Sequence, residues 1–239
     1  AILRLPKPLG EAERQIAKTV METHKNVRAV FSQISPVSGG FRLRELKHLA
    51  GERRVETLHR EHGCLFKVNL AETYFSPRLQ HEHLRVARLI REGEVVVNFF
   101  AGVGCFSIIA TKHAKPSKVY SIDLNPSAYR YMQENVLLNR VAGVVKPILG
   151  DAAEVAERLR GVADRVLLPL PALARKYLPH ALKCLKAEGG WIHYYDFVRA
   201  PSRVEALKEG LKLIPQTLQG FKLQIAYGKI VRSVGPKWW

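Results

Sequence analysis

The segment that most constrains this chain runs from Val95 to Ser107 and reads VVVNFFAGVGCFS. Valines typical of a buried strand lead into a turn with two glycines, and a stretch with helical spacing follows. Asp123 ends the next apolar run, roughly 20 residues beyond Gly102, where a nucleotide-binding βαβ unit places the carboxylate that binds ribose hydroxyls. The pattern predicts a parallel sheet with a ligand site at the end of its first strand.

The glycine turn also indicates which ligand to expect. Gly102 and Gly104 would let a ligand approach the backbone, and the start of the next helix supplies free N–H groups. Ser107 stands where the dinucleotide pattern has its third glycine. This favours a ligand without a pyrophosphate, and we expect S-adenosyl-L-methionine. A nicotinamide-dependent dehydrogenase is the alternative, but it would need the third glycine and a catalytic centre beyond the fifth strand.

Charge and composition narrow the class of partner. The 239 residues include 38 Lys and Arg against 21 acidic residues, a net charge of +17. So many positive charges repel one another, and an anionic partner would offset this repulsion. We therefore expect nucleic acid as the first candidate partner and a membrane surface as the second. A generally basic surface is the alternative. There is no apolar run of about 18 residues, no signal-peptide pattern, and only three widely separated cysteines. We therefore predict a cytoplasmic protein without a metal centre.

The chain divides into two predicted domains, a small α+β domain over 1–75 and an α/β domain over 76–239. The first part shows a helical segment over 11–28 and strand-like pieces over 29–34, 53–60 and 64–68. A helix over 77–90 leads into the second part. There the predicted strands are 95–99, 118–122, 144–149, 165–168, 191–197 and 221–231, and the predicted helices are 106–113, 127–139, 152–159, 173–185 and 201–211. Strands that alternate with helices predict a parallel sheet covered on both faces.

Ligands of such sheets bind beyond the carboxyl ends of the strands. The segments that fall there are 98–104, 123, 150–151, 169–171 and 193–196. Asp123 would accept from both ribose hydroxyls, and Asp151 could accept from the adenine amino group, although Asp151 is also a good helix N-cap. The predicted cofactor-binding residues are Phe100, Ala101, Gly102, Gly104, Asp123, Leu124, Asp151 and Pro169.

A second constellation lies before the sheet. Pro77 suits the start of a helix, which would put Glu82 and Arg85 on adjacent helical positions, and an exposed ion pair is the simplest interpretation. The motifs YFSPRL with Glu82, NFFAGVGCFS, DLNP and GGWIHYY occur in this order. Together they resemble the archaeal and eukaryotic tRNA (guanine-N1)-methyltransferases that modify position 37, and the relatives of these enzymes in wyosine synthesis. The resemblance covers roughly residues 40 to 235.

This resemblance implies a class I (Rossmann-like) methyltransferase sheet, with S-adenosyl-L-methionine as cofactor. It also implies that the small preceding domain helps to hold a tRNA anticodon stem-loop, and we expect a monomer. By its match to the family motifs, Glu82 is the general base that takes the N1 proton of guanine. Arg42 matches an arginine that stabilises negative charge on the guanine oxygen, and Tyr74 matches a tyrosine near the cofactor and the target base.

Two positions depart from the family pattern. Pro169-Leu170-Pro171 stands where the N1-methylating enzymes usually have Asn-Leu-Pro, and Asn98 replaces an acidic residue at the end of the first strand. A proline has no side-chain amide to bind the edge of a base. The main hypothesis is methylation of guanine N1 at position 37. The alternatives are methylation of carbon 7 of the wyosine precursor, aminocarboxypropyl transfer in the same pathway, and an RNA-binding scaffold without activity.

Overall fold

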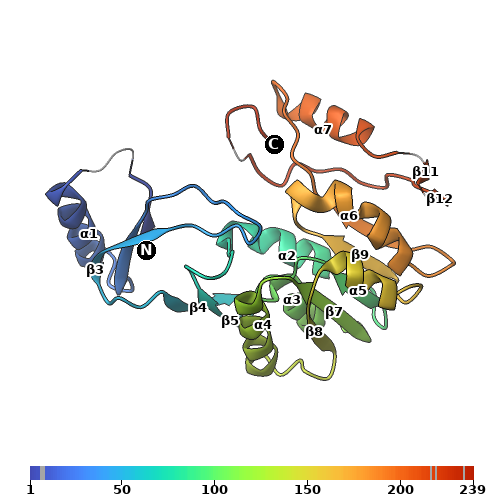
Figure 1. The fold of residues 1–239 in the computed structure, drawn as a ribbon, viewed down its shortest axis with the longest axis horizontal. Helices are drawn as coiled ribbons and strands as arrows, with labels where there is room; N and C mark the ends of the chain where they lie inside the picture. Colours follow the sequence, from blue (N-terminus) through green and yellow to red (C-terminus); the bar gives the residue numbers. More distant parts are fainter. Residues whose placement is uncertain (6–8, 216, 219, 234) are drawn as a thin grey trace.

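A five-stranded parallel sheet forms the centre of the computed structural model, which describes residues 1–5, 9–215, 217–218, 220–233 and 235–239 (Figure 1). The strand order is β10-β9-β6-β7-β8, and every neighbouring pair is parallel. The strands are β6 Val95–Asn98, β7 Lys118–Asp123, β8 Val145–Leu149, β9 Arg165–Leu168 and β10 Trp191–Tyr194. The predicted α/β class and parallel sheet are confirmed.

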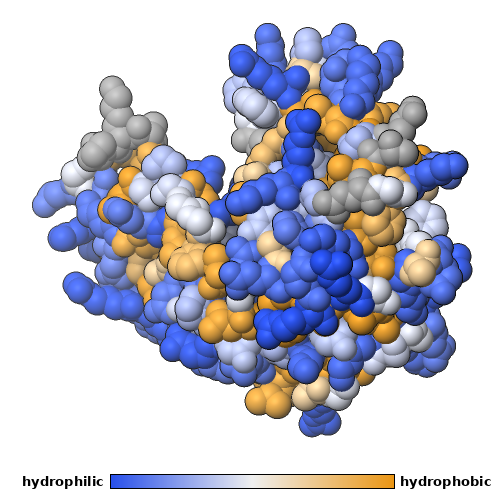
Figure 2. Space-filling view, turned by 45° about the vertical axis from the view of Figure 1, so that its right-hand side comes forward, coloured by the Kyte–Doolittle hydropathy of each residue, from blue (hydrophilic) through white to orange (hydrophobic). Residues whose placement is uncertain are grey.

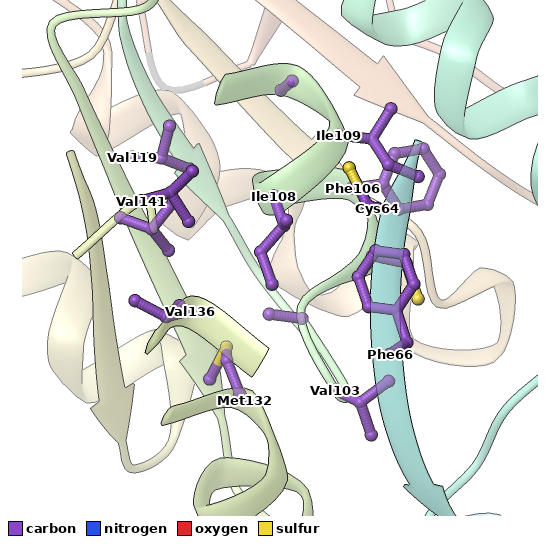
Figure 3. Packing of buried hydrophobic residues seen from close by; sticks show 14 of the residues in the cluster. Cys64, Phe66, Val103, Phe106, Ile108, Ile109, Val119, Met132, Val136 and Val141 are labelled. Carbon is purple, nitrogen blue, oxygen red and sulfur yellow. The ribbon is translucent and has the colours of Figure 1, made fainter. Parts of the chain in front are cut away.

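Helices cover both faces of this sheet, so the side chains that alternate between its two sides are buried on both. Val96 belongs to the core cluster formed with α3 and α4, and Val97 to the cluster formed with α5 and α6. Figure 3 shows the first cluster, in which Ile108 and Met132 lie between strands and helices. The helices are α3 Cys105–Ala114, α4 Pro126–Leu138, α5 Ala152–Arg158 and α6 Pro171–Cys184.

The helices of the sheet begin where capping residues occur in the sequence. Asn125 caps α4 by accepting a hydrogen bond from the Ser127 amide at 3.0 Å, and Pro126 occupies the first helical position. Asp151 caps α5 by accepting from the Ala153 amide at 2.7 Å. Pro171 occupies the corresponding position in α6. Each helix therefore starts directly after the carboxyl end of a strand.

The N-terminal part contains a sheet of β1 (Ile2–Leu3), β2 (Ala29–Gln33) and β3 (Leu46–Gly51), packed against α1 (Glu11–Thr23). The helix predicted to reach residue 28 is too long, since the chain turns at His24 to enter β2. Strand β3 was not predicted. The sequence of β3 does not indicate a strand, because Leu49 is the one buried residue in it and its hydropathy hardly alternates.

A β-hairpin follows, formed by β4 (Glu56–Glu61) and β5 (Cys64–Asn69). This hairpin packs on the large sheet's own core, where Phe66 lies beside the residues of α3 (Figure 3). Asn135 of α4 accepts from the Lys67 amide at 2.7 Å and donates to the carbonyls of Lys67 and Val103 at 3.1 and 3.0 Å. These bonds hold the hairpin to the sheet. The domain boundary at residue 75 stays a prediction.

A 3-10 turn, Pro77–Leu79, and helix α2, Gln80–Ala87, lead from the hairpin to the sheet, so the predicted helix over 77–90 ends early. The last elements are α7 (Arg203–Lys212), β11 (Thr217–Leu218) and β12 (Phe221–Lys222) (Figure 1). Leu218 and Phe221 of the two short strands pack against the core cluster of α5 and α6. No helix in the described ranges is long and apolar enough to cross a membrane.

Two predicted strands are wrong in extent. The strand over 191–197 ends at Tyr194, because the Asp196 carboxylate accepts the Phe197 amide and turns the chain. The strand over 221–231 stops at Lys222. Beyond Lys222 the apolar side chains of Ile225 and Tyr227 are exposed, at 41% and 65%. The alternating residues therefore do not pack against a core, and no strand forms there.

The asparagine that holds the hairpin provides a test of this packing. Replacing Asn135 with Ala leaves buried backbone groups of β5 without partners, so we expect the free energy of unfolding to fall by about 2–4 kcal/mol. Gln133 lies on the exposed side of the same helix and serves as the control. Gln133→Ala should change the free energy of unfolding by less than about 0.5 kcal/mol. Urea denaturation measures both. An equal, small effect of the two substitutions would show that this bond network does not hold the hairpin.

Candidate functional site

A cavity of about 1180 Å³ includes the region beyond the carboxyl ends of the strands and continues along β10 to Trp191. It receives side chains from all five segments that the sequence placed there, and from the residues before the sheet. In the space-filling view a notch at the top separates the lobe on the left from the upper lobe to its right, and the two are joined below it (Figure 2). The predicted site residues that line the cavity are Arg42, Tyr74, Glu82, Phe100, Gly102, Asp123, Leu124, Asp151 and Pro169. Ala101 and Gly104 do not line it.

The turn after β6 is built from backbone in the left-handed region. Phe100 has φ 57° and Gly102 has φ 58°, and the Gly102 amide donates to Asp123 Oδ2 at 2.6 Å. Gly104, at φ 94°, packs under α3, where an added Cβ would lie 3.1 Å from Ile108 Cδ1. Glycine is therefore needed at position 104 because a side chain would not fit there, whereas Gly102 borders the cavity.

Asp123 lies at the end of β7 with both carboxylate oxygens engaged once. Oδ2 accepts from Gly102, and Oδ1 accepts from the Asn125 amide at 2.9 Å. Burial raises the pKa of Asp123, and the two N–H donors act in the opposite direction. A carboxylate offers about four lone-pair sites, so two remain for a ligand. Leu124, 53% exposed, provides apolar surface next to them.

Asp151 is confirmed as a helix N-cap. It also accepts from the Tyr177 hydroxyl, at 3.0 and 2.9 Å to its two oxygens. Burial and this bond raise the pKa of Tyr177 to about 12. The Tyr177 ring packs edge-on against Phe100, with 4.9 Å between the ring centroids. Sequence reasoning missed Tyr177, because an aromatic residue at a helical position is indistinguishable from a core residue. Contact of Asp151 with an adenine stays a prediction.

Glu82, in the first turn of α2, is buried with 3% exposure. Arg85 donates to both of its oxygens, at 2.8 Å from Nε and 2.6 Å from Nη2, and the Tyr195 hydroxyl donates at 2.6 Å. Burial raises the pKa of Glu82, but the bonds from Arg85 and Tyr195 outweigh it, so the pKa is lowered. The predicted ion pair with Arg85 exists, but its carboxylate is buried rather than exposed.

Arg42 and Tyr74 also line the cavity and contact each other. Arg42 lies in the turn between β2 and β3 at φ 55°, and its amide donates to the Gly39 carbonyl at 3.1 Å. Its guanidinium lies over the Tyr74 ring, 4.7 Å from the centroid, a cation–π contact. The structure thus brings the three predicted catalytic residues to one cavity, from three separate parts of the chain.

A buried network that the sequence did not reveal supports β10. Arg165, 3% exposed, donates to Glu94 at 2.7 and 3.0 Å, and its Nη1 lies 2.9 Å from His193 Nε2. A guanidinium has no acceptor, so His193 must accept at Nε2 and carry its proton on Nδ1. Burial, then the charges of Arg165 and Arg85, lower the pKa of His193 to about 3.

Two departures noted in the sequence have different structural settings. Asn98 is fully buried under the turn, where its Nδ2 donates to Ser107 Oγ at 2.9 Å. Ser121 donates to the same Ser107 oxygen at 2.6 Å, so this serine joins β6, β7 and α3. Pro169 instead lines the cavity and offers no hydrogen-bond donor there.

Comparison with known proteins assigns the chain to a family. Residues 57–223 match the TRM5/TYW2 methyltransferase domain, and residues 1–54 match the TYW2 N-terminal domain. The chain belongs to the TRM5/TYW2 methyltransferase family. Among relatives, it is 40% identical to the tRNA (guanine(37)-N(1))-methyltransferase Trm5b of Pyrococcus abyssi, covering 99% of this chain and 69% of Trm5b. It is also 40% identical to the tRNA 4-demethylwyosine(37)-methyltransferase Taw21 of Saccharolobus solfataricus, covering 93% of this chain and 80% of Taw21.

Solved structures of family members are similar throughout. The complex of aTrm5 with tRNALeu superposes with a TM-score of 0.85 at 35% identity, covering 99% of this chain and 66% of aTrm5. The complex of Methanocaldococcus jannaschii TYW2 with AdoMet superposes with a TM-score of 0.68 at 36% identity, covering 81% and 86%. The chain therefore spans about two thirds of the longer Trm5 proteins and most of TYW2. These neighbours confirm the class I methyltransferase fold.

The network around His193 gives a prediction for titration. Because its pKa is lowered from 6.5 to about 3, His193 should stay neutral between pH 5 and 8. Nitrogen-15 chemical shifts of the histidine rings, assigned with a His193→Asn variant, report the protonation state. We expect no titration step of His193 in this range. A step near pH 6.5 would show that the contact with Arg165 is not formed in solution.

Proposed function

We propose that this chain is an S-adenosyl-L-methionine-dependent tRNA methyltransferase that acts on the purine at position 37, with guanine N1 as the acceptor atom. The observation that carries the proposal is a single cavity with the Asp123 carboxylate on one wall and the buried Glu82 carboxylate on another. A cofactor and an extruded base would both bind in this cavity, one near each carboxylate.

The residues at the Asp123 end fit S-adenosyl-L-methionine. Asp123 keeps lone pairs for ribose hydroxyls, Leu124 offers an apolar face to the adenine, and the turn at Phe100 and Gly102 brings backbone to the cavity wall. Asp151 could accept from the adenine amino group. The cofactor would supply a methyl group on a positively charged sulfur. AdoMet bound to the TYW2 neighbour supports this assignment.

The residues at the other end fit proton removal from a base. Guanine N1 carries its proton at neutral pH and becomes a nucleophile only when the proton leaves. Glu82, held ionised by Arg85, can accept it, Arg42 would stabilise the negative charge that moves to the guanine oxygen, and Tyr74 would orient the base. Proton removal and alignment with the methyl group then provide the rate enhancement. A base of a stacked anticodon loop must be extruded to reach this cavity.

The charge distribution supports an RNA partner. The first part of the chain and the region of α7 are rich in exposed or half-exposed basic residues, among them Arg53, Arg54, Arg60, Arg199, Arg203 and Lys208. Lys and Arg position RNA by contacts with phosphates and do not read its sequence. The complex of the neighbour aTrm5 with tRNALeu supports tRNA as the partner, and we place the contact at the anticodon stem-loop. A monomeric, cytoplasmic enzyme in which residues 1–75 contact the tRNA remains part of this proposal.

One observation favours a second acceptor atom. Pro169 lines the cavity where an asparagine amide would bind the base edge, and Taw21, at 40% identity, is named for action on 4-demethylwyosine. Carbon 7 of the wyosine precursor is therefore the alternative acceptor. Transfer of an aminocarboxypropyl group from the same cofactor and a scaffold without activity complete the alternatives.

The cofactor assignment predicts the effect of removing Asp123. Asp123→Ala deletes a charge-assisted acceptor worth roughly 1.5–3 kcal/mol, so the Kd for S-adenosyl-L-methionine should rise about 10- to 150-fold. Glu92→Ala removes an exposed carboxylate from the opposite edge of the sheet and should leave Kd unchanged. Isothermal titration calorimetry measures both. A Kd within about twofold of wild type for Asp123→Ala would refute the assignment.

The catalytic assignment predicts a selective loss. Glu82→Gln should bind cofactor and tRNA normally but lose roughly 10²–10⁴-fold in methyl transfer, with partial recovery at high pH as the N1 proton leaves unaided.

A second substitution tests the choice of acceptor atom. Pro169→Asn introduces a side-chain amide at the cavity wall and should raise N1 methylation relative to any action on the tricyclic precursor. Single-turnover assays with both tRNA forms measure these rates. Full activity of Glu82→Gln would contradict the role of the base, and an unchanged ratio for Pro169→Asn would show that residue 169 does not select the acceptor.

A further inference from the structure

Three hydrogen bonds occupy the Glu82 carboxylate unevenly. Oε1 accepts from Arg85 Nη2 at 2.6 Å and from the Tyr195 hydroxyl at 2.6 Å, whereas Oε2 accepts only from Arg85 Nε at 2.8 Å. Each carboxylate oxygen has about two lone-pair sites. Oε1 is therefore filled within the described part of the chain, and Oε2 keeps one site for a further donor.

The two donors belong to different elements that the core holds in place. Arg85 lies one helical turn after Glu82 on α2, and its side chain is 26% exposed, so it borders the cavity. Tyr195 follows β10, and its ring packs against the core cluster, 6.3 Å from the Phe106 ring of α3. Because both donors are held independently, the carboxylate cannot rotate without losing a bond. Its orientation in the cavity is thereby fixed.

We propose that Arg85 and Tyr195 are positioning residues that leave Oε2 as the oxygen of Glu82 that takes the proton from the substrate, and that Arg85 keeps this carboxylate ionised. The proposal rests on the proposed function and adds the atom that acts. In the step, the N1–H bond breaks and the proton goes to Oε2. N1 keeps the electron pair and bonds to the methyl carbon, whose bond to sulfur breaks with its electrons left on the sulfur.

The charged and titratable groups around Glu82 show which one controls its ionisation. Besides Arg85 and Tyr195, it is faced by His193 of β10 and Lys229 of the C-terminal segment. His193 is neutral at the pH of an assay, because its pKa is about 3. Burial favours the protonated carboxyl, and the Arg85 bonds are the largest influence in the opposite direction. Without the arginine charge, Glu82 would take up a proton at a higher pH and lose its function as a base there.

The test compares pH profiles of methyl transfer. For Arg85→Gln, activity relative to wild type should fall at least about tenfold further at pH 6 than at pH 8, because the carboxyl is protonated at the lower pH. Arg85→Lys keeps the charge and loses the two-pronged geometry. Its activity relative to wild type should therefore be reduced by the same factor at both values of pH.

Two more variants separate orientation from general structure. Tyr195→Phe frees a site on Oε1 and should lower kcat about 5- to 10-fold while KM for tRNA stays unchanged. The matched control is Arg160→Gln, which breaks an exposed pair with Glu157 at the same sequence spacing, from the turn that follows α5. It should change neither kcat nor the pH profile. Calorimetry with S-adenosyl-L-methionine checks that each variant is folded.

The outcomes distinguish this inference from the function on which it rests. Parallel pH profiles for Arg85→Gln and wild type would overturn the role of Arg85, even if Glu82→Gln is inactive. Full activity of Glu82→Gln would instead overturn the proposed base itself. If Arg85→Gln does not bind cofactor, Arg85→Lys and Tyr195→Phe decide: unchanged kcat in both refutes the proposal, and reduced kcat at constant KM supports it.

Discussion

The carboxylate of Glu82 joins two elements that are 113 residues apart in the sequence, helix α2 and the end of strand β10. Removing this carboxylate from water is costly, and it is tolerated because Arg85 and Tyr195 donate to it. Arg85 keeps its place because α2 packs on α3, and Tyr195 keeps its place because its ring packs on the first core cluster beside Phe106 of α3. One wall of the cavity thus depends on the packing of the whole first core cluster, and a defect there would displace the proposed base.

The cofactor end depends on local structure instead. A strand, a turn with Gly102 and the next strand's Asp123 are enough to bring amide and carboxylate together at 2.6 Å. Such a site is a property of one βαβ unit, whereas the catalytic end combines the first sheet, α2 and β10. The cavity between them can align two ligands because both ends are attached to the same parallel sheet.

This difference explains what could be predicted from the sequence. The alternation of strands and helices along the chain, the helix N-cap at Asp151 and the place of Asp123 at a strand end all follow from short-range patterns. The burial of Glu82, the Arg165–His193 contact and strand β3 depend on residues far apart in the chain, and no local pattern indicates them. The alternating hydropathy over 223–231 predicts a strand that does not form, because no buried face matches it. Glu82 and Arg42 were found only through resemblance to a family.

The proposed activity is the transfer of a methyl group to the purine at position 37 of tRNA, with cofactor and base bound in one cavity. Mass spectrometry of nucleosides tests it most directly, after incubation with methyl-labelled S-adenosyl-L-methionine and two tRNAs, one with guanine and one with the tricyclic precursor at position 37. We expect labelled N1-methylguanosine at position 37 of the first tRNA. Absence of label from position 37 in both tRNAs, or label at another position, would contradict it.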